Sequence, residues 1–152
     1  MLDSSFAIQL AAAVLCGGIV GVERQLRGKA IGIRTGMLIC LATQVFVRLG
    51  ITLDDSDVDP TRVIGQVVTG VGFLGAGVIL ARGGAITGVT SAAVVWMLAA
   101  IGSTIGVGRP LEGLVLSLLV VGVLIGVRLL ESAFKRLRGR YDEPEDADKP
   151  GV

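Results

Sequence analysis

The chain has 152 residues, of which 52% are hydrophobic and 18% are charged, and its mean hydropathy is +0.77. A soluble domain carries about 25% charged residues, so this composition excludes an ordinary soluble fold and predicts an integral membrane protein. Histidine is absent, which removes the usual acid–base group and the commonest metal ligand. The two cysteines, Cys16 and Cys40, lie in separate apolar stretches. We therefore expect no disulfide framework, no metal site, no cofactor and no catalytic residue, and the chain is not expected to be an enzyme.

Five apolar stretches approach the roughly 20 residues that a helix needs to cross a membrane. They cover residues 6–22, 36–53, 63–81, 85–107 and 111–127. Their apolar residues are adjacent and do not alternate with polar ones, as they would in the strands of a membrane barrel. The sequence therefore predicts an all-α membrane protein, a compact bundle of about five transmembrane helices with Gly/Ala-rich packing faces.

The second stretch is the weakest of the five, because Arg48 interrupts it. An arginine at the centre of a span costs about 2.5 to 3.5 kcal/mol, and less where its side chain reaches the headgroups. Segment 36–53 is thus expected either to span fully, with Arg48 in its last turns, or to form a re-entrant segment.

Basic residues are divided unevenly between the predicted loops. Eleven of the 14 Lys and Arg residues fall in the first and third connections or after the fifth helix. The positive-inside rule then places the N-terminus outside and the C-terminus in the cytoplasm. Asp3 and the lack of an early basic residue argue against a signal peptide. We divide the chain into a transmembrane domain (1–130) and a basic juxtamembrane segment with a disordered acidic cytoplasmic tail (131–152).

Small residues recur at helical spacing in the third stretch. Gly65, Thr69, Gly72 and Ala76 fall on one helix face, which favours close approach of a second helix. Residues 70–75 also match the pattern GxGxxG, but their position in mid-span lacks the strand and the acidic residue of a dinucleotide site. Similar small pairs in the other stretches predict a tight bundle with little central space.

Polar residues at one end of the first two stretches are candidate functional groups. Glu23 and Arg24 end the first helix, and Arg34 and Thr35 open the second from the same predicted cytoplasmic side. A carboxylate and a guanidinium that meet at the membrane edge can neutralise each other. The pattern predicts either a salt-bridged anchor or a polar pocket for an anion or a partner.

A second polar group opens the third helix. Asp59 is placed to cap the helix start, and Arg62 and Gln66 continue as a polar stripe into the bilayer. An unpaired amide in hydrocarbon is costly, so Gln66 is expected to find a partner, with Thr90 and Ser91 as candidates. The stripe fits hydrogen bonding between helices as well as it fits a functional site.

These two polar blocks resemble the signatures of the MgtC/SapB family. The first signature corresponds to residues 17–24 and 28–35, and the second to residues 59–62, 66–79, 88–93 and Trp96. One departure is Ser91, where the family commonly has threonine, and this change keeps the hydroxyl. Longer members carry a cytoplasmic regulatory-type domain after the fifth helix, so this chain resembles the short form that has the membrane domain only.

The resemblance implies a multi-pass protein of the bacterial inner membrane, linked to magnesium limitation and homeostasis and to virulence or stress adaptation. It implies a regulatory action on another membrane complex, the F-type ATP synthase in the best-known relatives. The expected partners are therefore the lipid bilayer, such a complex and further copies of the chain, and no nucleic acid.

An alternative function is a small transporter or channel for Mg²⁺ or another cation. Four aspartates in the second loop supply the oxygen ligands that hard cations prefer. No aspartate or glutamate lies deep within a predicted helix, however, which favours the regulatory interpretation.

Overall fold

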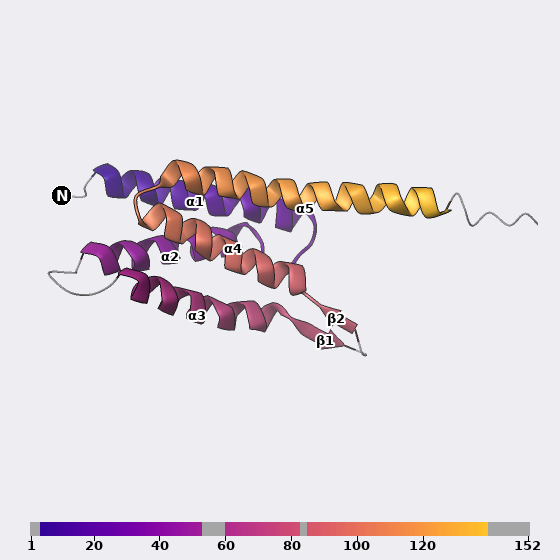
Figure 1. Cartoon of the computed structure of the whole chain (residues 1–152), viewed down its shortest axis with the longest axis horizontal. Helices are drawn as coiled ribbons and strands as arrows, with labels where there is room; N and C mark the ends of the chain where they lie inside the picture. Colours follow the sequence, from indigo (N-terminus) through magenta and orange to yellow (C-terminus); the bar gives the residue numbers. More distant parts are fainter. Residues whose placement is uncertain (1–3, 53–59, 83–84, 140–152) are drawn as a thin grey trace, which may run out of the picture. The chain divides into compact units, whose positions relative to one another are not determined.

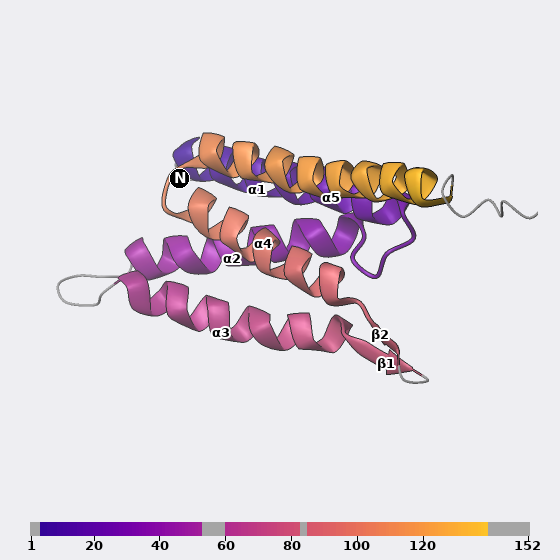
Figure 2. The same cartoon turned by 45° about the vertical axis from the view of Figure 1, so that its right-hand side comes forward.

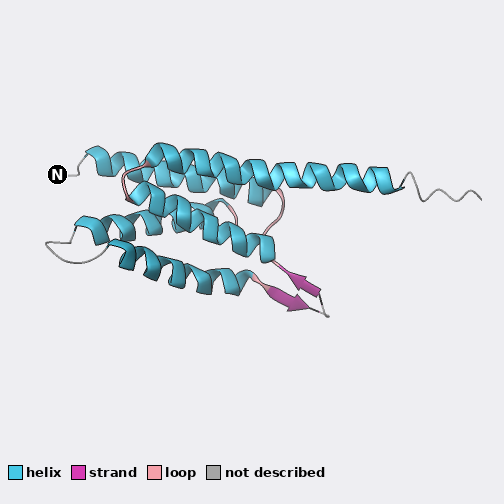
Figure 3. Ribbon diagram, viewed as in Figure 1, coloured by secondary structure: helices cyan, strands magenta, loops and turns pink. Residues whose placement is uncertain are grey.

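The structure of the chain is a computed structural model that describes residues 4–52, 60–82 and 85–139. Within these ranges five helices follow one another: α1 (Ser4–Leu26), α2 (Ile33–Thr52), α3 (Pro60–Val78), α4 (Val89–Gly106) and α5 (Pro110–Gly139). An antiparallel hairpin of β1 (Leu80–Arg82) and β2 (Ala85–Thr87) joins α3 to α4 (Figures 1 and 3). All five helices are long and apolar enough to cross a membrane, which confirms the predicted all-α membrane class.

The hairpin is the main departure from the predicted spans. Residues 85–87, expected to open the fourth span, pair with residues 80–82 as a strand. Gly88 then takes a φ of 91°, a left-handed conformation that glycine adopts without strain, and α4 begins at Val89. A Cβ at Gly88 would also collide with the backbone of Val78. The strand β2 therefore ends at Gly88 and α4 begins directly after it, although the apolar pattern of the sequence continues across this junction.

α2 runs without a break from Ile33 to Thr52. This unbroken helix supports the spanning alternative for segment 36–53 over a re-entrant one, and it leaves Arg48 in the second-last turn. α5 continues to Gly139, well beyond the predicted end of its span at residue 127.

The chain divides into two compact units, residues 1–121 and 122–152. In the first unit α2 packs against both α1 and α4, and α3 packs mainly against α4 (Figures 1 and 2). α4 is the central helix, because half of its span is buried, whereas only 11% of the α3 span is buried. Its side chains Leu98, Ile101 and Ile105 are fully enclosed. In the second unit the described residues form the continuation of α5 to Gly139.

Glycines allow the close contacts of α2 with its two neighbours. A Cβ added to Gly17 of α1 would lie 2.8 Å from the carbonyl carbon of Gly36 in α2. A Cβ added to Gly102 of α4 would lie 2.9 Å from the Cβ of Thr43 in α2. Such distances exclude any side chain, so these helices meet through small residues, as predicted for the bundle.

Candidate functional site

A polar cleft of about 520 Å³ lies where α1 turns into α2. We call it the basic cleft, and its lining residues are Gln25, Lys29, Ala30, Gly32, Arg34, Thr35 and Leu38. The Gln25 side-chain oxygen accepts a hydrogen bond of 3.1 Å from the backbone N–H of Ile33. This bond caps the first turn of α2 and ties the end of α1 to it. Lys29 and Arg34 are exposed, and neither forms a hydrogen bond or ion pair with any described residue.

The end of α1 holds a buried ion-pair group next to this connection in the sequence. The two oxygens of Glu23 lie 3.4 Å from Arg24 Nη1 and 3.4 Å from Arg27 Nε. Glu23 and Arg24 are only 8% and 4% exposed. The structure thus pairs Glu23 with Arg24 and Arg27, whereas Arg34 and Thr35, which the sequence grouped with them, line the basic cleft instead.

A second polar network, which sequence reasoning missed, joins the first turns of α1 to the last turns of α2. Gln9 Oε1 accepts hydrogen bonds from Gln44 Nε2 at 3.2 Å and from Arg48 Nη1 at 2.9 Å. The Arg48 guanidinium lies 5.2 Å from the centre of the Phe6 ring and also donates to Ser5 at 3.4 Å. Arg48 therefore turns toward α1 and gains partners there. The signal that could have found this network is the i, i+4 spacing of Gln44 and Arg48, since polar side chains within a span need partners.

The network leaves one buried acceptor without a donor. Gln44 is fully buried, and its Oε1 has no hydrogen-bond partner in the described part of the chain. The other hydrogen bonds of the network, one of them charge-assisted, join α1 to α2. We therefore interpret the network as a structural contact that stabilises the packing of these two helices.

The polar stripe of α3 is not paired in the way the sequence predicts. Arg62 and Gln66 are both exposed, and Gln66 forms no hydrogen bond with any described residue, so it does not meet Thr90 or Ser91. Thr90 is exposed at the start of α4, whereas Ser91 is buried. Asp59 lies outside the described residues.

The small-residue face of α3 is open in the structure. Gly65, Thr69, Gly72 and Ala76 are all exposed, and a Cβ at Gly65 or Gly72 would meet no atom within 4 Å. Thr69 donates its hydroxyl hydrogen bond back to the Gly65 carbonyl at 3.0 Å. Within the described part of residues 1–121, no helix covers this face, and its role in helix packing stays a prediction.

α3 contacts α4 through a neighbouring face instead. Val71 and Gly75 are buried, and a Cβ at Gly75 would lie 3.8 Å from the Ala92 Cβ of α4. Residues 71 and 75 each precede a member of the small-residue face by one position, which is a rotation of about 100° around a helix with 3.6 residues per turn. The spacing of small residues in the sequence predicts a packing face on α3, but it does not tell which of two neighbouring faces contacts α4.

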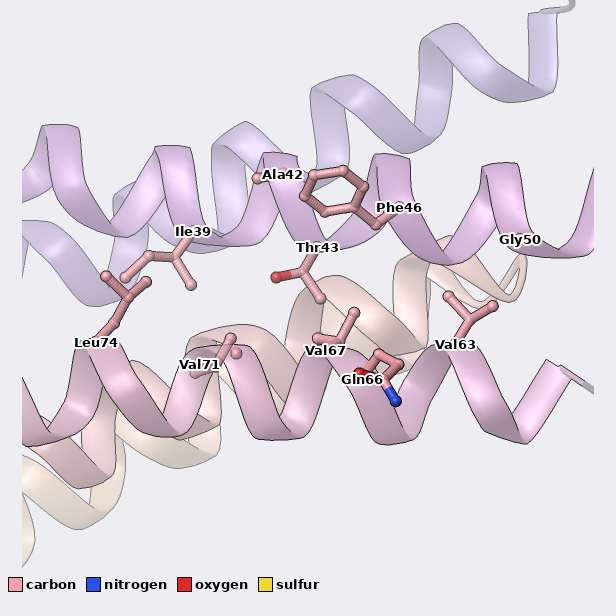
Figure 4. A pocket seen from close by; sticks show the side chains of 11 residues that line it. Ile39, Ala42, Thr43, Phe46, Gly50, Val63, Gln66, Val67, Val71 and Leu74 are labelled. Carbon is pink, nitrogen blue, oxygen red and sulfur yellow. The ribbon is translucent and has the colours of Figure 1, made fainter.

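An apolar groove of about 530 Å³ lies between α2 and α3. Figure 4 shows Phe46 and Thr43 of α2 opposite Val67 and Gln66 of α3 across it. Its lining residues are Ile39, Ala42, Thr43, Phe46, Gly50, Val63, Gln66, Val67, Gly70, Val71 and Leu74. Among its described lining residues, only Thr43 and Gln66 bring polar side chains to it, so the groove suits apolar contact.

The described residues contain no group of three or more His, Cys, Asp or Glu side chains that could hold a metal ion. The four aspartates of the second loop lie between residues 54 and 59, outside the described ranges.

Five candidate spans, a tight α1–α2–α4 core and an open α3 face define a multi-pass, all-helical membrane protein. The profile of the MgtC family matches residues 10–133, and the chain belongs to this family. No solved structure matches the chain.

Similar proteins include "Putative magnesium transporter YhiD" of Escherichia coli (strain K12), which is 42% identical over 80% of this chain and 61% of that protein. "Protein MgtC" of Brucella abortus (strain 2308) is 40% identical over 75% of this chain and 48% of its own length. "Protein MgtC" of Salmonella typhimurium (strain LT2) is 36% identical over 90% of this chain and 57% of its own length. The chain thus spans about half to three fifths of the length of these curated relatives.

Proposed function

We propose that this chain is a regulatory protein of the bacterial inner membrane that acts by binding another membrane protein through the open face of α3. The observation that carries the proposal is the exposure of Gly65, Thr69, Gly72 and Ala76 in a span that is only 11% buried. Small residues let two helix backbones approach closely in lipid, where packing and interhelical hydrogen bonds drive association. A face of this kind gains contacts only when a second helix covers it.

Gln66 adds a polar contact beside this face. Its amide is exposed and bonds to no described residue, and an amide in hydrocarbon is stabilised when an incoming helix supplies a partner. The family resemblance supports a large membrane complex such as the F-type ATP synthase as the partner, in cells limited for magnesium or during virulence and stress adaptation. We propose binding and not catalysis as the mode of action.

We also propose that the basic cleft faces the cytoplasm, with the N-terminus outside and the C-terminus inside. The support is the concentration of Lys and Arg residues between residues 24 and 34 and after residue 127. Cysteine-accessibility labelling of Ser4→Cys and Lys29→Cys variants in intact cells tests this. Labelling of Lys29→Cys by a membrane-impermeant reagent added outside would reverse the assignment.

The docking proposal is tested by comparing Gly72→Leu with Gly77→Leu. Both glycines are open, with no atom within 4 Å of an added Cβ, but they lie about 140° apart around α3. Tagged protein purified from native membranes should recover a partner complex in stoichiometric amount, and Gly72→Leu should reduce this recovery about tenfold at unchanged accumulation. Gly77→Leu should retain the partner.

Three results would contradict the docking proposal. The first is isolation of the wild-type chain without a stoichiometric partner. The second is equal recovery with Gly72→Leu and Gly77→Leu. The third is a deletion strain with unchanged membrane potential and ATP level.

Transport of Mg²⁺ or another cation is the second candidate function. The observation that favours it is the similarity to the E. coli protein named "Putative magnesium transporter YhiD". Flux into proteoliposomes separates the two candidates. Selective Mg²⁺ uptake that is lost on Asp59→Ala or Gln66→Ala would favour transport, whereas absence of uptake would favour regulation.

A further inference from the structure

We propose that the basic cleft binds a phosphate group, carried either by the headgroup of an anionic phospholipid or by a free phosphate ion. The site lies at the α1–α2 connection and involves no residue of the open α3 face. Phosphate binding in the basic cleft is therefore independent of partner binding at the open α3 face, and a test of one does not test the other.

The first argument is unbalanced charge. Both oxygens of Glu23 are already engaged by Arg24 and Arg27. Lys29 and Arg34 line the cleft with no ion-pair partner among the described residues. Two cations that share one cleft repel each other, and an anion placed between them removes this repulsion and bonds to both.

The second argument is a set of unused donors at the start of α2. The backbone N–H of Ile33 is taken by Gln25, and that of Gly36 by the Gly32 carbonyl at 3.0 Å. The N–H groups of Arg34 and Thr35, between them, have no acceptor in the described part of the chain. Free N–H groups and the positive end of a 20-residue helix dipole favour a bound phosphate.

The side chains of the same two residues extend this donor set. The Thr35 hydroxyl and the Arg34 guanidinium both belong to the lining of the cleft, together with the Lys29 ammonium. A phosphate has enough acceptor oxygens to use hydroxyl, guanidinium, ammonium and backbone donors at once. A carboxylate has only two oxygens and would leave part of this donor set unused.

The shape of the cleft favours a lipid as the carrier of the phosphate. Its volume of about 520 Å³ exceeds the needs of one phosphate ion, and Leu38 forms part of its lining. Leu38 follows Arg34 by four residues, on the same face of α2 and one turn further into the span. It is 65% exposed, so it offers an apolar surface for the first part of an acyl chain while Arg34 holds the headgroup.

Lipid titration of the full chain, purified in detergent and stripped of lipid, tests the proposal by native mass spectrometry. Dioleoyl phosphatidylglycerol should bind at least about tenfold more tightly than dioleoyl phosphatidylcholine. Lys29→Gln and Arg34→Gln should each weaken phosphatidylglycerol binding about fivefold, the effect of removing one cation near an anionic headgroup. Arg27→Gln removes the same charge at the same end without lining the cleft, and it should change binding less than twofold.

A second arm measures inorganic phosphate by titration calorimetry on the same stripped protein. Phosphate binding that Arg34→Gln abolishes, without a lipid preference, would assign the site to the free ion. Lipid selectivity without phosphate binding would assign it to the headgroup. The proposal is overturned if neither probe binds selectively, or if Arg27→Gln weakens binding as much as Arg34→Gln while all variants elute as folded protein.

Discussion

Replacing Gly17 with alanine tests whether the stability of the protein depends on the close contact between the α1 and α2 backbones. The new Cβ would lie 2.8 Å from the carbonyl carbon of Gly36 and 2.8 Å from the Cα of Met37, and it would also collide with the Gly36 carbonyl oxygen. All three atoms belong to the α2 backbone. Ordinary contact begins near 3.4 Å, and the Gly36 carbonyl oxygen is closer than the other two atoms. The two helices must therefore separate by more than about 0.6 Å at this crossing, or α2 must bend.

The energy of this change follows from two opposing effects. Overpacking of a tight interior costs about 1 to 3 kcal/mol, whereas alanine is better than glycine in a helix by about 0.5 to 1 kcal/mol. We therefore expect Gly17→Ala to lower the free energy of unfolding, by up to about 2.5 kcal/mol. Reversible unfolding with sodium dodecyl sulfate in mixed micelles, followed by circular dichroism, measures it.

Two other glycines provide matched controls. A Cβ at Gly18 would approach only the side chain of Met37, with its terminal methyl at 2.9 Å, and this flexible end can move aside. A Cβ at Gly72 would meet nothing within 4 Å. Gly18→Ala and Gly72→Ala should thus be neutral or slightly stabilising. The close-approach argument is refuted if Gly17→Ala is as stable as Gly72→Ala, or if all three variants lose stability equally.

The polar groups give two further predictions, both measured by the same unfolding assay. Gln9→Leu removes the acceptor of the buried Gln44 amide and should cost about 1 to 2 kcal/mol; unchanged stability would show that Gln44 finds another partner. Glu23→Gln leaves the buried Arg24 without its counter-charge and should cost about 2 kcal/mol or more. Glu112→Gln, in an exposed pair, is its control and should cost less than about 1 kcal/mol; equal losses in the two variants would contradict the role of burial.

Helix positions could largely be predicted from the sequence, because the length of an apolar stretch is a local property. α1 was expected over residues 6–22 and extends over Ser4–Leu26, since a helix can continue past the membrane edge into polar residues. The hairpin before α4 was missed because Ala85 and Ile86 are apolar in either conformation. There the deciding factor is the backbone at Gly88, where any side chain would collide with Val78.

Among the polar contacts, those between neighbours in the chain could be predicted from the sequence, and those between distant residues could not. Glu23 and Arg24 are neighbours in the chain, so their pairing could be expected from local spacing alone. The contact of Gln9 with Gln44 and Arg48 joins residues 35 and 39 positions apart. No local pattern specifies such a distance, because it depends on the register in which α1 and α2 pack.

The sequence alone determined the membrane class, the five apolar helices and the small-residue spacing of α3, since composition and periodicity act within one segment. Only the tertiary structure decided which α3 face meets α4. Val71 and Gly75 turn inward, and the face of Gly72 remains open about 100° away. The physical reason is that a glycine-rich helix offers several faces of nearly equal smoothness. Which face of α3 is buried depends on the shapes of the helices that pack against it. The spacing of residues within α3 carries no information about those shapes.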